Sequence, residues 1–340
     1  MTSHGGLRAA IIGAGLMGRW HADAIGPTGG RVAAIVDPND TARETLRQQY
    51  PNAESLSELD AAQLARIADV AHVCTPLDSH VAIATALIAH GLHALIEKPL
   101  APTREETARL LEAADRRRVV ICPVHQFPFQ DGVQQVRRWL PSLGVVRGVE
   151  YSTCSAGAAL GDAGALDRLV ADILPHPLSL ITAILGVTTA GVSWQVVHPT
   201  PGELRAIASI GPTILDLSIS AHGRPTGNVL RVTADMGAAT ADLFHGFAVR
   251  HDGAVSRRAK ITRPFVDAGS TLAGASVNLA RRALAREHAY PGLRELVHRF
   301  YSAVATGSPS PIVSSEIADI AATRDELVSA MRVRDVRQVT

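Results

Sequence analysis

The chain has 340 residues, which is enough for two domains with substantial hydrophobic cores. Its composition, 46% hydrophobic and 19% charged, is typical of a globular α/β protein. The net charge of +1 gives no electrostatic reason to expect a nucleic-acid or membrane partner, and we expect neither.

Cysteine and histidine usage limits the remaining classes. Cys74, Cys122 and Cys154 are odd in number and lack metal-ligand spacing, so we expect reduced core thiols of a cytoplasmic protein. The fourteen histidines include no His-x-x-x-His pair, so no metal site is predicted. The first six residues are polar, and no run of about 18 apolar residues occurs, so neither a signal peptide nor a membrane span is expected.

The most informative stretch begins with an apolar run at residues 7–12. It leads into Gly13-Ala14-Gly15-Leu16-Met17-Gly18, and an amphipathic segment follows. A second apolar run, residues 31–36, ends at Asp37. This order of strand, glycine turn, helix, strand and acid is typical of a dinucleotide-binding site.

Each part of this stretch has a physical role. Gly13 permits a sharp turn, Gly15 lets a pyrophosphate approach the backbone, and Gly18 lets the helix pack closely on the sheet. The helix N-terminus offers free N–H groups to the phosphates. Asp37 can accept from ribose hydroxyls and repels a 2′-phosphate, which predicts NAD rather than NADP. The residues predicted to bind the cofactor here are Gly13, Gly15, Leu16, Met17, Gly18 and Asp37.

Strand and helix patterns alternate up to about residue 124, which predicts a parallel sheet covered by helices on both faces. Helices are expected at residues 16–25, 41–49, 79–90 and 103–117, and strands at 7–12, 31–36, 70–75, 92–96 and 119–124. In such a fold the ligand lies outside the carboxyl ends of the strands. The residues at these ends are therefore the candidates for a site.

The pattern changes after residue 125, so we predict a dinucleotide-binding domain at residues 1–125 and an α+β domain at 126–340, whose C-terminal helix can return to the first domain. Helices are expected at residues 129–140, 166–185, 293–305 and 315–331, with a turn at 141–144 and prolines interrupting the second. Short strands are expected at residues 145–153, 192–197, 203–210, 213–221, 228–234 and 238–244. The last five have no helices between them, which predicts an open, largely antiparallel sheet. Residues 257–276 show no clear pattern.

Polar residues stand at the ends of the predicted parallel strands. Thr75-Pro76 ends one strand, with His80 shortly after it, and Glu97-Lys98-Pro99 ends the next. His125-Gln126 follows the last strand. A solvated loop lysine is the alternative for Lys98, but its place directly after a buried strand and before a proline favours a positioned side chain.

Asp172 and His176 stand four residues apart in Asp172-Ile173-Leu174-Pro175-His176-Pro177. They could form a simple surface pair on a helix. Residues before proline avoid helical geometry, however, so Pro175 and Pro177 argue against an undisturbed helix. We therefore expect a positioned segment at the start of a helix.

Together these motifs resemble those of the Gfo/Idh/MocA family of NAD(P)-dependent oxidoreductases, over most of the chain. The resemblance implies a Rossmann domain followed by an open-faced antiparallel sheet domain, with the active site in the cleft between them. From the inositol dehydrogenase branch, it implies that Lys98, Asp172 and His176 are the catalytic group. It also implies a cis peptide at Pro99 beside the nicotinamide. Thr75, Pro76, His80, Glu97, Lys98 and Pro99 complete the predicted cofactor site.

Two positions depart from the inositol dehydrogenase pattern. Ser179 stands where that branch usually has an aspartate, and Gln126 stands where many members carry an arginine. Both changes remove charge from the expected substrate pocket, which argues against inositol more than against hydride transfer. The predicted substrate-binding residues are Lys98, His125, Gln126, Asp172, His176 and Ser179.

The predicted reaction is hydride transfer between nicotinamide and a secondary alcohol or carbonyl of a sugar, cyclitol or related polar small molecule. His176 would act as the base, Lys98 would stabilise charge on the reacting oxygen, and Asp172 would orient one of them. The alternative is a non-catalytic dinucleotide- or sugar-sensing regulator on the same fold.

We also expect a homodimer or homotetramer formed through the sheet of the second domain. Helices within the chain cover only one face of that sheet, and a large exposed apolar face usually marks an interface. The outer face is expected to carry Leu215, Leu217 and Ile219.

Overall fold

The computed structural model describes residues 6–155, 162–285 and 290–335. The chain divides into two compact units, residues 1–125 with 293–321, and residues 126–292 with 322–340. The sequence analysis placed its boundary at the same point after residue 125. The second domain was predicted to span residues 126–340, with a C-terminal helix able to return to the first domain, whereas residues 293–321 belong to the first unit.

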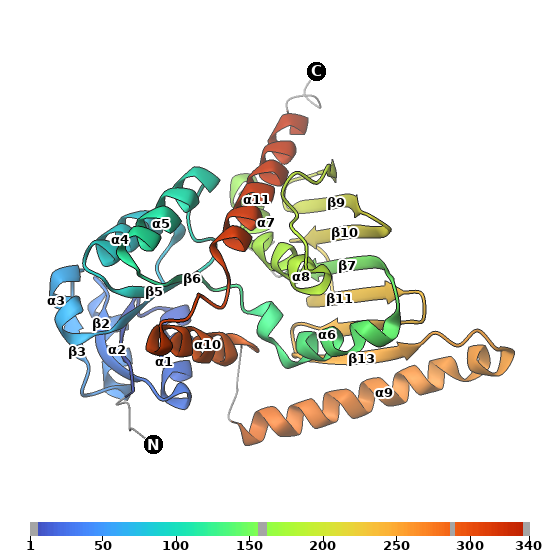
Figure 1. Ribbon diagram of the computed structural model, residues 1–340, viewed down its shortest axis with the longest axis horizontal. Helices are drawn as coiled ribbons and strands as arrows, with labels where there is room; N and C mark the ends of the chain where they lie inside the picture. The colour runs from blue at the N-terminus through green and yellow to red at the C-terminus, as the bar shows by residue number, and fades with distance from the viewer. Residues whose placement is uncertain (1–5, 156–161, 286–289, 336–340) are drawn as a thin grey trace. The chain divides into compact units, whose positions relative to one another are not determined.

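A six-stranded sheet forms the centre of the first unit, with the order β3-β2-β1-β4-β5-β6 and parallel pairing throughout (Figure 1). Its strands are β1 Arg8–Ile12, β2 Arg31–Val36, β3 Glu54–Leu56, β4 Val70–Val73, β5 His93–Ile96 and β6 Ile121–Pro123. The strand order reverses between β1 and β4, which is the point where sheets of this topology bind dinucleotides.

Helices of the first unit begin where the sequence supplies caps. Asn39, Asp60 and Thr103 precede α2, α3 and α5, and each accepts a hydrogen bond from the backbone N–H three residues later. The helices are α1 Leu16–Ile25, α2 Asp40–Gln49, α3 Ala61–Ile67, α4 Leu77–Ala89, α5 Arg104–Arg117 and α10 Leu293–Thr306. The sequence analysis missed β3 and α3, because so short a strand and helix carry no readable periodicity.

A seven-stranded sheet forms the centre of the second unit, with the order β13-β12-β11-β7-β10-β9-β8. Its pairs are antiparallel except for β7 with β10, so the expectation of a largely antiparallel sheet is confirmed. The strands are β7 Val146–Cys154, β8 Gln195–Val197, β9 Glu203–Ile210, β10 Thr213–Ser220, β11 Gly227–Ala234, β12 Gly237–Asp242 and β13 Phe247–Asp252.

The two faces of β10 are the reverse of those expected from the sequence. Leu215, Leu217 and Ile219 are at most 1% exposed, whereas Ile214 on the other face is 58% exposed. Side chains alternate along a strand, and the more apolar alternate set is the one that α7 covers. The outer face is therefore more polar than expected.

The helices of the second unit are α6 Asp131–Leu143, α7 Ala163–Ile173, α8 Pro175–Leu185, α9 Arg257–Leu284 and the later part of α11 Ser314–Asp335. α6 continues through Pro141, where a turn was predicted, and ends before Gly144 at positive φ. Residues 257–276, which showed no clear pattern, are helical in α9. Residues 163–185 are long and apolar enough to cross a membrane, but 61% of their most apolar window is buried within the structure.

Candidate functional site

The three glycines between β1 and α1 differ in what a side chain would meet. Gly13 has φ of +96°, and a Cβ there would lie 2.7 Å from the carbonyl oxygen of Cys74. A Cβ on Gly18 would overlap the carbonyl oxygen of Gly13. Protein packing alone therefore requires glycine at both positions. A Cβ on Gly15 would meet no heavy atom within 4 Å, so the protein itself does not need glycine there.

The open position at Gly15 lies at the N-terminus of α1, which begins at Leu16. Gly15 provides no side-chain cap, and the first turn of α1 contains no acidic residue. Unbonded N–H groups at a helix start attract anions. The residues present therefore fit the pyrophosphate of a dinucleotide, which would lie where a side chain on Gly15 would otherwise project.

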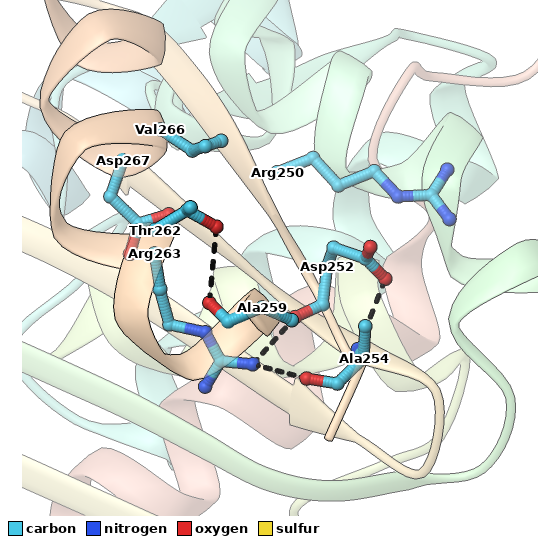
Figure 2. Close-up of a pocket in the computed structure, with 8 residues that line it drawn as sticks. All are labelled: Arg250, Asp252, Ala254, Ala259, Thr262, Arg263, Val266 and Asp267. Carbon is cyan, nitrogen blue, oxygen red and sulfur yellow. Dashed lines mark hydrogen bonds between the residues drawn. The ribbon is translucent and has the colours of Figure 1, made fainter. Parts of the chain in front are cut away.

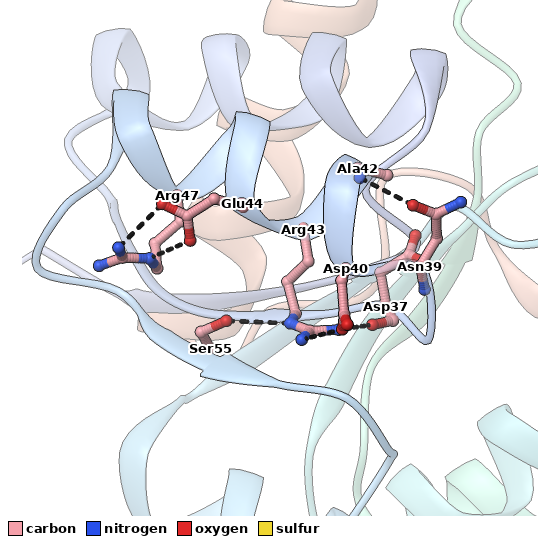
Figure 3. A network of polar contacts seen from close by, with 8 residues as sticks. All are labelled: Asp37, Asn39, Asp40, Ala42, Arg43, Glu44, Arg47 and Ser55. Atoms are coloured by element: carbon pink, nitrogen blue, oxygen red, sulfur yellow. Dashed lines mark hydrogen bonds and ion pairs between the residues drawn. The ribbon is translucent and has the colours of Figure 1, made fainter.

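Asp37 directly follows β2 and lies in a network of polar contacts with Asn39 and Arg43 (Figure 3). One of its carboxylate oxygens accepts from Ala14 N at 2.6 Å, and the other accepts from Asn39 N at 2.7 Å. Arg43 of α2 reaches the same place and donates to Asp37 O, to Asp40 and to Ser55 Oγ. The sequence analysis missed this arginine because it is six residues from Asp37 and is brought back by a helical turn.

His80 ties together two of the predicted cofactor-binding loops. Its ring nitrogens lie 2.9 Å from Thr75 O and 2.9 Å from Pro99 O, and the residue is 1% exposed. Pro76 occupies the N-cap position of α4. The Lys98–Pro99 peptide bond is cis, as the resemblance implied. His80 is thus engaged with the backbone of both loops, which indicates a positioning role.

A chain of hydrogen-bonded side chains runs behind Lys98. Glu97 Oε1 lies 3.1 Å from His21 Nε2, and His21 Nδ1 lies 2.9 Å from His72 Nδ1. His72 Nε2 lies 2.8 Å from the hydroxyl of Tyr301 in α10. All four residues are at most 9% exposed. Nothing local in the sequence indicates the bond between His21 and Glu97.

Glu97 carries the negative charge of this hydrogen-bonded network. Burial raises the pKa of the Glu97 carboxyl, but the hydrogen bond from His21 and the charge of Lys98 outweigh it, so the pKa lies below its ordinary value. Burial holds the pKa of His72 well below its ordinary value. Glu97 is therefore a carboxylate at neutral pH, and its other oxygen accepts from Lys98 N at 3.2 Å.

His125 and Gln126 follow β6. Burial, with the charge of Lys98, lowers the pKa of His125 to about 3, so the ring is neutral. His125 Nδ1 and Gln126 Oε1 are buried and have no hydrogen-bond partner among the described residues. Orphaned buried polar atoms are rare and are a reason to look for a ligand. The role of both residues as substrate contacts stays a prediction.

Asp172 and His176 lie in the second unit, at the junction of α7 and α8. His176 is in the first turn of α8 and stacks on Phe127, with ring centroids 4.2 Å apart and 18° between the planes. Ser179 is fully buried, and its hydroxyl donates to His176 O at 2.8 Å. That bond fixes the Ser179 hydroxyl inside the helix and argues against its predicted contact with substrate. The sequence analysis also missed Phe127.

Arg324 of α11 supports the same junction. Its Nε donates to Ala171 O at 3.1 Å, and its side chain is 10% exposed. Burial lowers the pKa of Arg324, while Asp325 and Asp172 oppose that shift through their charges. The guanidinium thus lies within electrostatic reach of Asp172, a relationship between residues 152 positions apart that no sequence pattern indicates.

Known proteins resemble the chain most clearly in the first unit. Residues 7–125 match the model of an oxidoreductase family with an NAD-binding Rossmann fold. Inositol 2-dehydrogenase from Corynebacterium glutamicum is 30% identical over 108 residues, 31% of this chain and 32% of that protein. The same enzyme from Burkholderia multivorans is 30% identical over 201 residues, 57% of this chain and 58% of that protein. The chain thus matches less than two thirds of the length of these relatives.

The fold extends further than these matches. The structure of UDP-N-acetylglucosamine 3-dehydrogenase from Acidithiobacillus ferrooxidans is similar over 96% of this chain and 98% of that one, with a TM-score of 0.74 and 20% identity. At that identity the likeness concerns the fold alone. Residues 7–125 thus form a domain that matches the NAD-binding Rossmann fold of an oxidoreductase family.

Proposed function

We propose that the protein is an NAD-dependent dehydrogenase or reductase that moves a hydride between nicotinamide and a secondary alcohol or carbonyl of a polar small molecule. The observation that carries the proposal is the open space at Gly15, beside an uncapped helix N-terminus and the Asp37 carboxylate. Relatives and structural neighbours named as inositol, UDP-N-acetylglucosamine and levoglucosan dehydrogenases support a sugar or cyclitol as the substrate class.

The bound cofactor supplies the hydride acceptor or donor. Lys98 donates a hydrogen bond to the reacting oxygen and stabilises the negative charge that develops there. His176 removes the hydroxyl proton in oxidation and returns it in reduction, because an imidazole titrates near neutral pH. Phe127 holds the ring of His176 by stacking. Asp172, whose charge acts on Arg324, orients either His176 or Lys98.

The polar groups proposed to contact substrate favour an uncharged molecule. His125 is neutral, Gln126 carries no charge, and each has a buried atom that lacks a protein partner. A substrate hydroxyl can satisfy both atoms, because it can donate to Gln126 Oε1 and form a hydrogen bond with His125 Nδ1. We therefore propose a neutral polyhydroxylated substrate and place the enzyme in the cytoplasm, where its free cysteines stay reduced.

A substrate panel tests the activity. NADH absorbance is followed while the protein is given NAD and a series of polyols, sugars and nucleotide sugars. Lys98→Met should lower turnover about 10²-fold or more while leaving NADH affinity nearly unchanged. His176→Ala should lower it by about 10²- to 10⁴-fold and remove the pH–rate limb near neutrality.

The double variant tests whether the two residues serve one reaction. Residues that act as a unit have non-additive effects, so Lys98→Met with His176→Ala should cost little more than the worse single change. Ser179→Ala is the control, because its hydroxyl is bonded within α8 and should leave turnover unchanged. Wild-type turnover in both single variants would refute the assignment. NADH binding without turnover of any substrate would favour the sensing regulator.

Asp37 is proposed to select NAD over NADP. The nearest cation, Arg43, is held by three partners and its side chain is only 15% exposed, so it is poorly placed to bind a 2′-phosphate. In the wild-type protein the dissociation constant of NADPH should exceed that of NADH. Asp37→Ser should lower the ratio of these two constants by at least about tenfold. Glu44→Gln removes an exposed charge from the same helix and is the control. Tighter binding of NADPH by the wild-type protein would contradict the proposal.

A further inference from the structure

α9 faces the opposite way from an ordinary surface helix. It packs against β13 in the second unit, and Asn278 is its only buried residue (Figure 1). A surface helix normally turns its apolar stripe toward the core. Here the large apolar side chains point outward, with Ile261, Phe265, Leu272 and Leu279 between 63% and 79% exposed.

Polar contacts hold α9 in this orientation. Arg263 donates to the carbonyl oxygens of Asp252 and Ala254 (Figure 2). Asn278 Nδ2 donates to His245 O at 2.9 Å. The further contacts from α9 to the rest of the unit are Asp267 with His251, Arg281 with Asp131, and Arg282 with His245. The polar side of the helix is thus used within the unit, which leaves the apolar side toward solvent.

From Ile261 to Leu284 the outward side is a continuous uncharged sector. At about 100° per residue, Ile261, Phe265, Leu272 and Leu279 fall within roughly 40° of one another. A second apolar row, formed by Val266, Val277 and Leu284, lies on the far side of the sector and is 58% to 87% exposed. Small or uncharged residues fill the space between the rows: Thr262, Gly269, Ala273, Ser276, Ala280 and Ala283. Such a sector is broad enough to lie flat on an extended apolar surface.

The charges of α9 decide what kind of surface that is. The helix carries six basic residues and one acidic residue. Arg257, Arg258 and Lys260 are exposed near its start, and Arg281 and Arg282 stand in its last turn. A second copy of α9 in the parallel direction would bring the two basic starts together. An anionic surface complements the three exposed cations at the start of the helix, whereas Arg281 is paired with Asp131.

We propose that α9 binds an anionic phospholipid surface, with its outward apolar sector at the boundary between headgroups and acyl chains and the basic residues at its start on lipid phosphates. Basic amphipathic helices bind membranes through this combination of apolar burial and charge. The net charge of the whole chain argued against a membrane partner, but that average conceals the strongly basic helix. The proposal is independent of hydride transfer.

Vesicle co-sedimentation tests the proposal. The full chain should bind phosphatidylcholine vesicles that contain about 30 mol% phosphatidylserine, and rising salt should weaken that binding. The triple variant Phe265→Ser, Leu272→Ser and Leu279→Ser should lower the partition coefficient at least about tenfold. Replacing Arg257, Arg258 and Lys260 by glutamine should lower it by about fivefold per charge, with a smaller salt dependence.

A matched control removes apolar surface elsewhere in the second unit. Val145, Val187 and Met236 are 37% to 65% exposed and lie outside α9, so their replacement by serine should leave vesicle binding unchanged. Circular dichroism and NADH titration show whether each variant is folded. Hydrogen exchange should also show slower exchange of α9 amides when anionic vesicles are added.

Three outcomes would overturn the proposal. The first is that the wild-type protein fails to bind anionic vesicles. The second is that it binds vesicles of pure phosphatidylcholine equally well. Alternatively, the α9 serine variant would change the protein from a dimer to a monomer without any vesicle binding by the wild type. That last result would assign the sector to a second copy of the chain.

Discussion

His21 Nε2 lies 3.1 Å from Glu97 Oε1, which links the helix after the glycine turn to the acid directly before Lys98. The same ring continues through His72 to the hydroxyl of Tyr301. The loop that carries the proposed catalytic lysine is therefore held from behind by three buried rings. Removing the hydrogen bond at the Tyr301 end of this network should therefore affect Glu97.

Tyr301→Phe removes the last hydrogen bond of this chain and leaves His72 Nε2 buried without a partner. The free energy of unfolding of the first unit should fall by about 1–3 kcal/mol, measured by urea denaturation. Tyr50→Phe is the control, because the Tyr50 hydroxyl bonds Asp23 near the surface and its loss should cost about 0.5 kcal/mol or less. Equal losses in the two variants would contradict a special role for the buried chain.

Two buried histidines should make stability depend on pH. The pKa values of His72 and His125 are lowered by burial, the latter to about 3, so the unfolded chain binds protons that the folded chain does not. Their contribution is present above the unfolded pKa of 6.5 and is lost as pH falls below it, by up to about 1.4 kcal/mol per pH unit for each ring. Urea midpoints at about pH 7 and pH 5.5 measure this slope.

The variant His125→Gln should reduce that slope and keep the sign. The lowered pKa of Glu97 acts in a different window, since its contribution is lost only as pH falls below about 4.5. A protein that became more stable between pH 7 and pH 5.5 would show that neither histidine is held neutral.

The glycines at positions 15 and 18 should separate cofactor binding from stability. Gly15→Ala places a methyl group in open space, so thermal stability should change little while NADH affinity falls about tenfold or more. Gly18→Ala forces a methyl group against Gly13 O, so the first unit should lose several kcal/mol. Fluorescence titration and thermal unfolding give the two readouts. Unchanged NADH affinity in Gly15→Ala would show that the pyrophosphate does not lie at that position.

The outer face of the second sheet is proposed to join copies of the chain into a dimer or tetramer. Ile207, Ile214 and Val229 are 37% to 58% exposed there. Ile214→Glu should lower the mass measured by light scattering at micromolar concentration, because a buried unpaired charge disfavours the interface. Ile261→Glu makes the same change on α9 and should leave the mass unaltered. A monomeric wild-type protein would exclude this interface.

The sequence by itself determined the parts of the protein that depend on neighbouring residues. The glycine turn, the acid after the second strand and the alternation of strands and helices are encoded in contiguous segments. Gly18 lies against Gly13 in the same turn, and Lys98-Pro99 could be singled out by its place directly after a strand. Such features can be recognised in the sequence because backbone geometry and side-chain periodicity act over a few residues.

Only the tertiary structure decided which distant groups meet. The bond between His21 and Glu97 joins residues 76 positions apart, and Arg324 reaches the backbone of Ala171 from the end of the chain. The face of β10 that is buried depended on which of its two alternating sets of side chains α7 covers. The outward direction of the apolar sector of α9 depended on the polar contacts made by the other side of that helix. Each of these relationships is set by packing between elements, because burial and charge pairing depend on proximity in space and leave no mark on the spacing of residues along the chain.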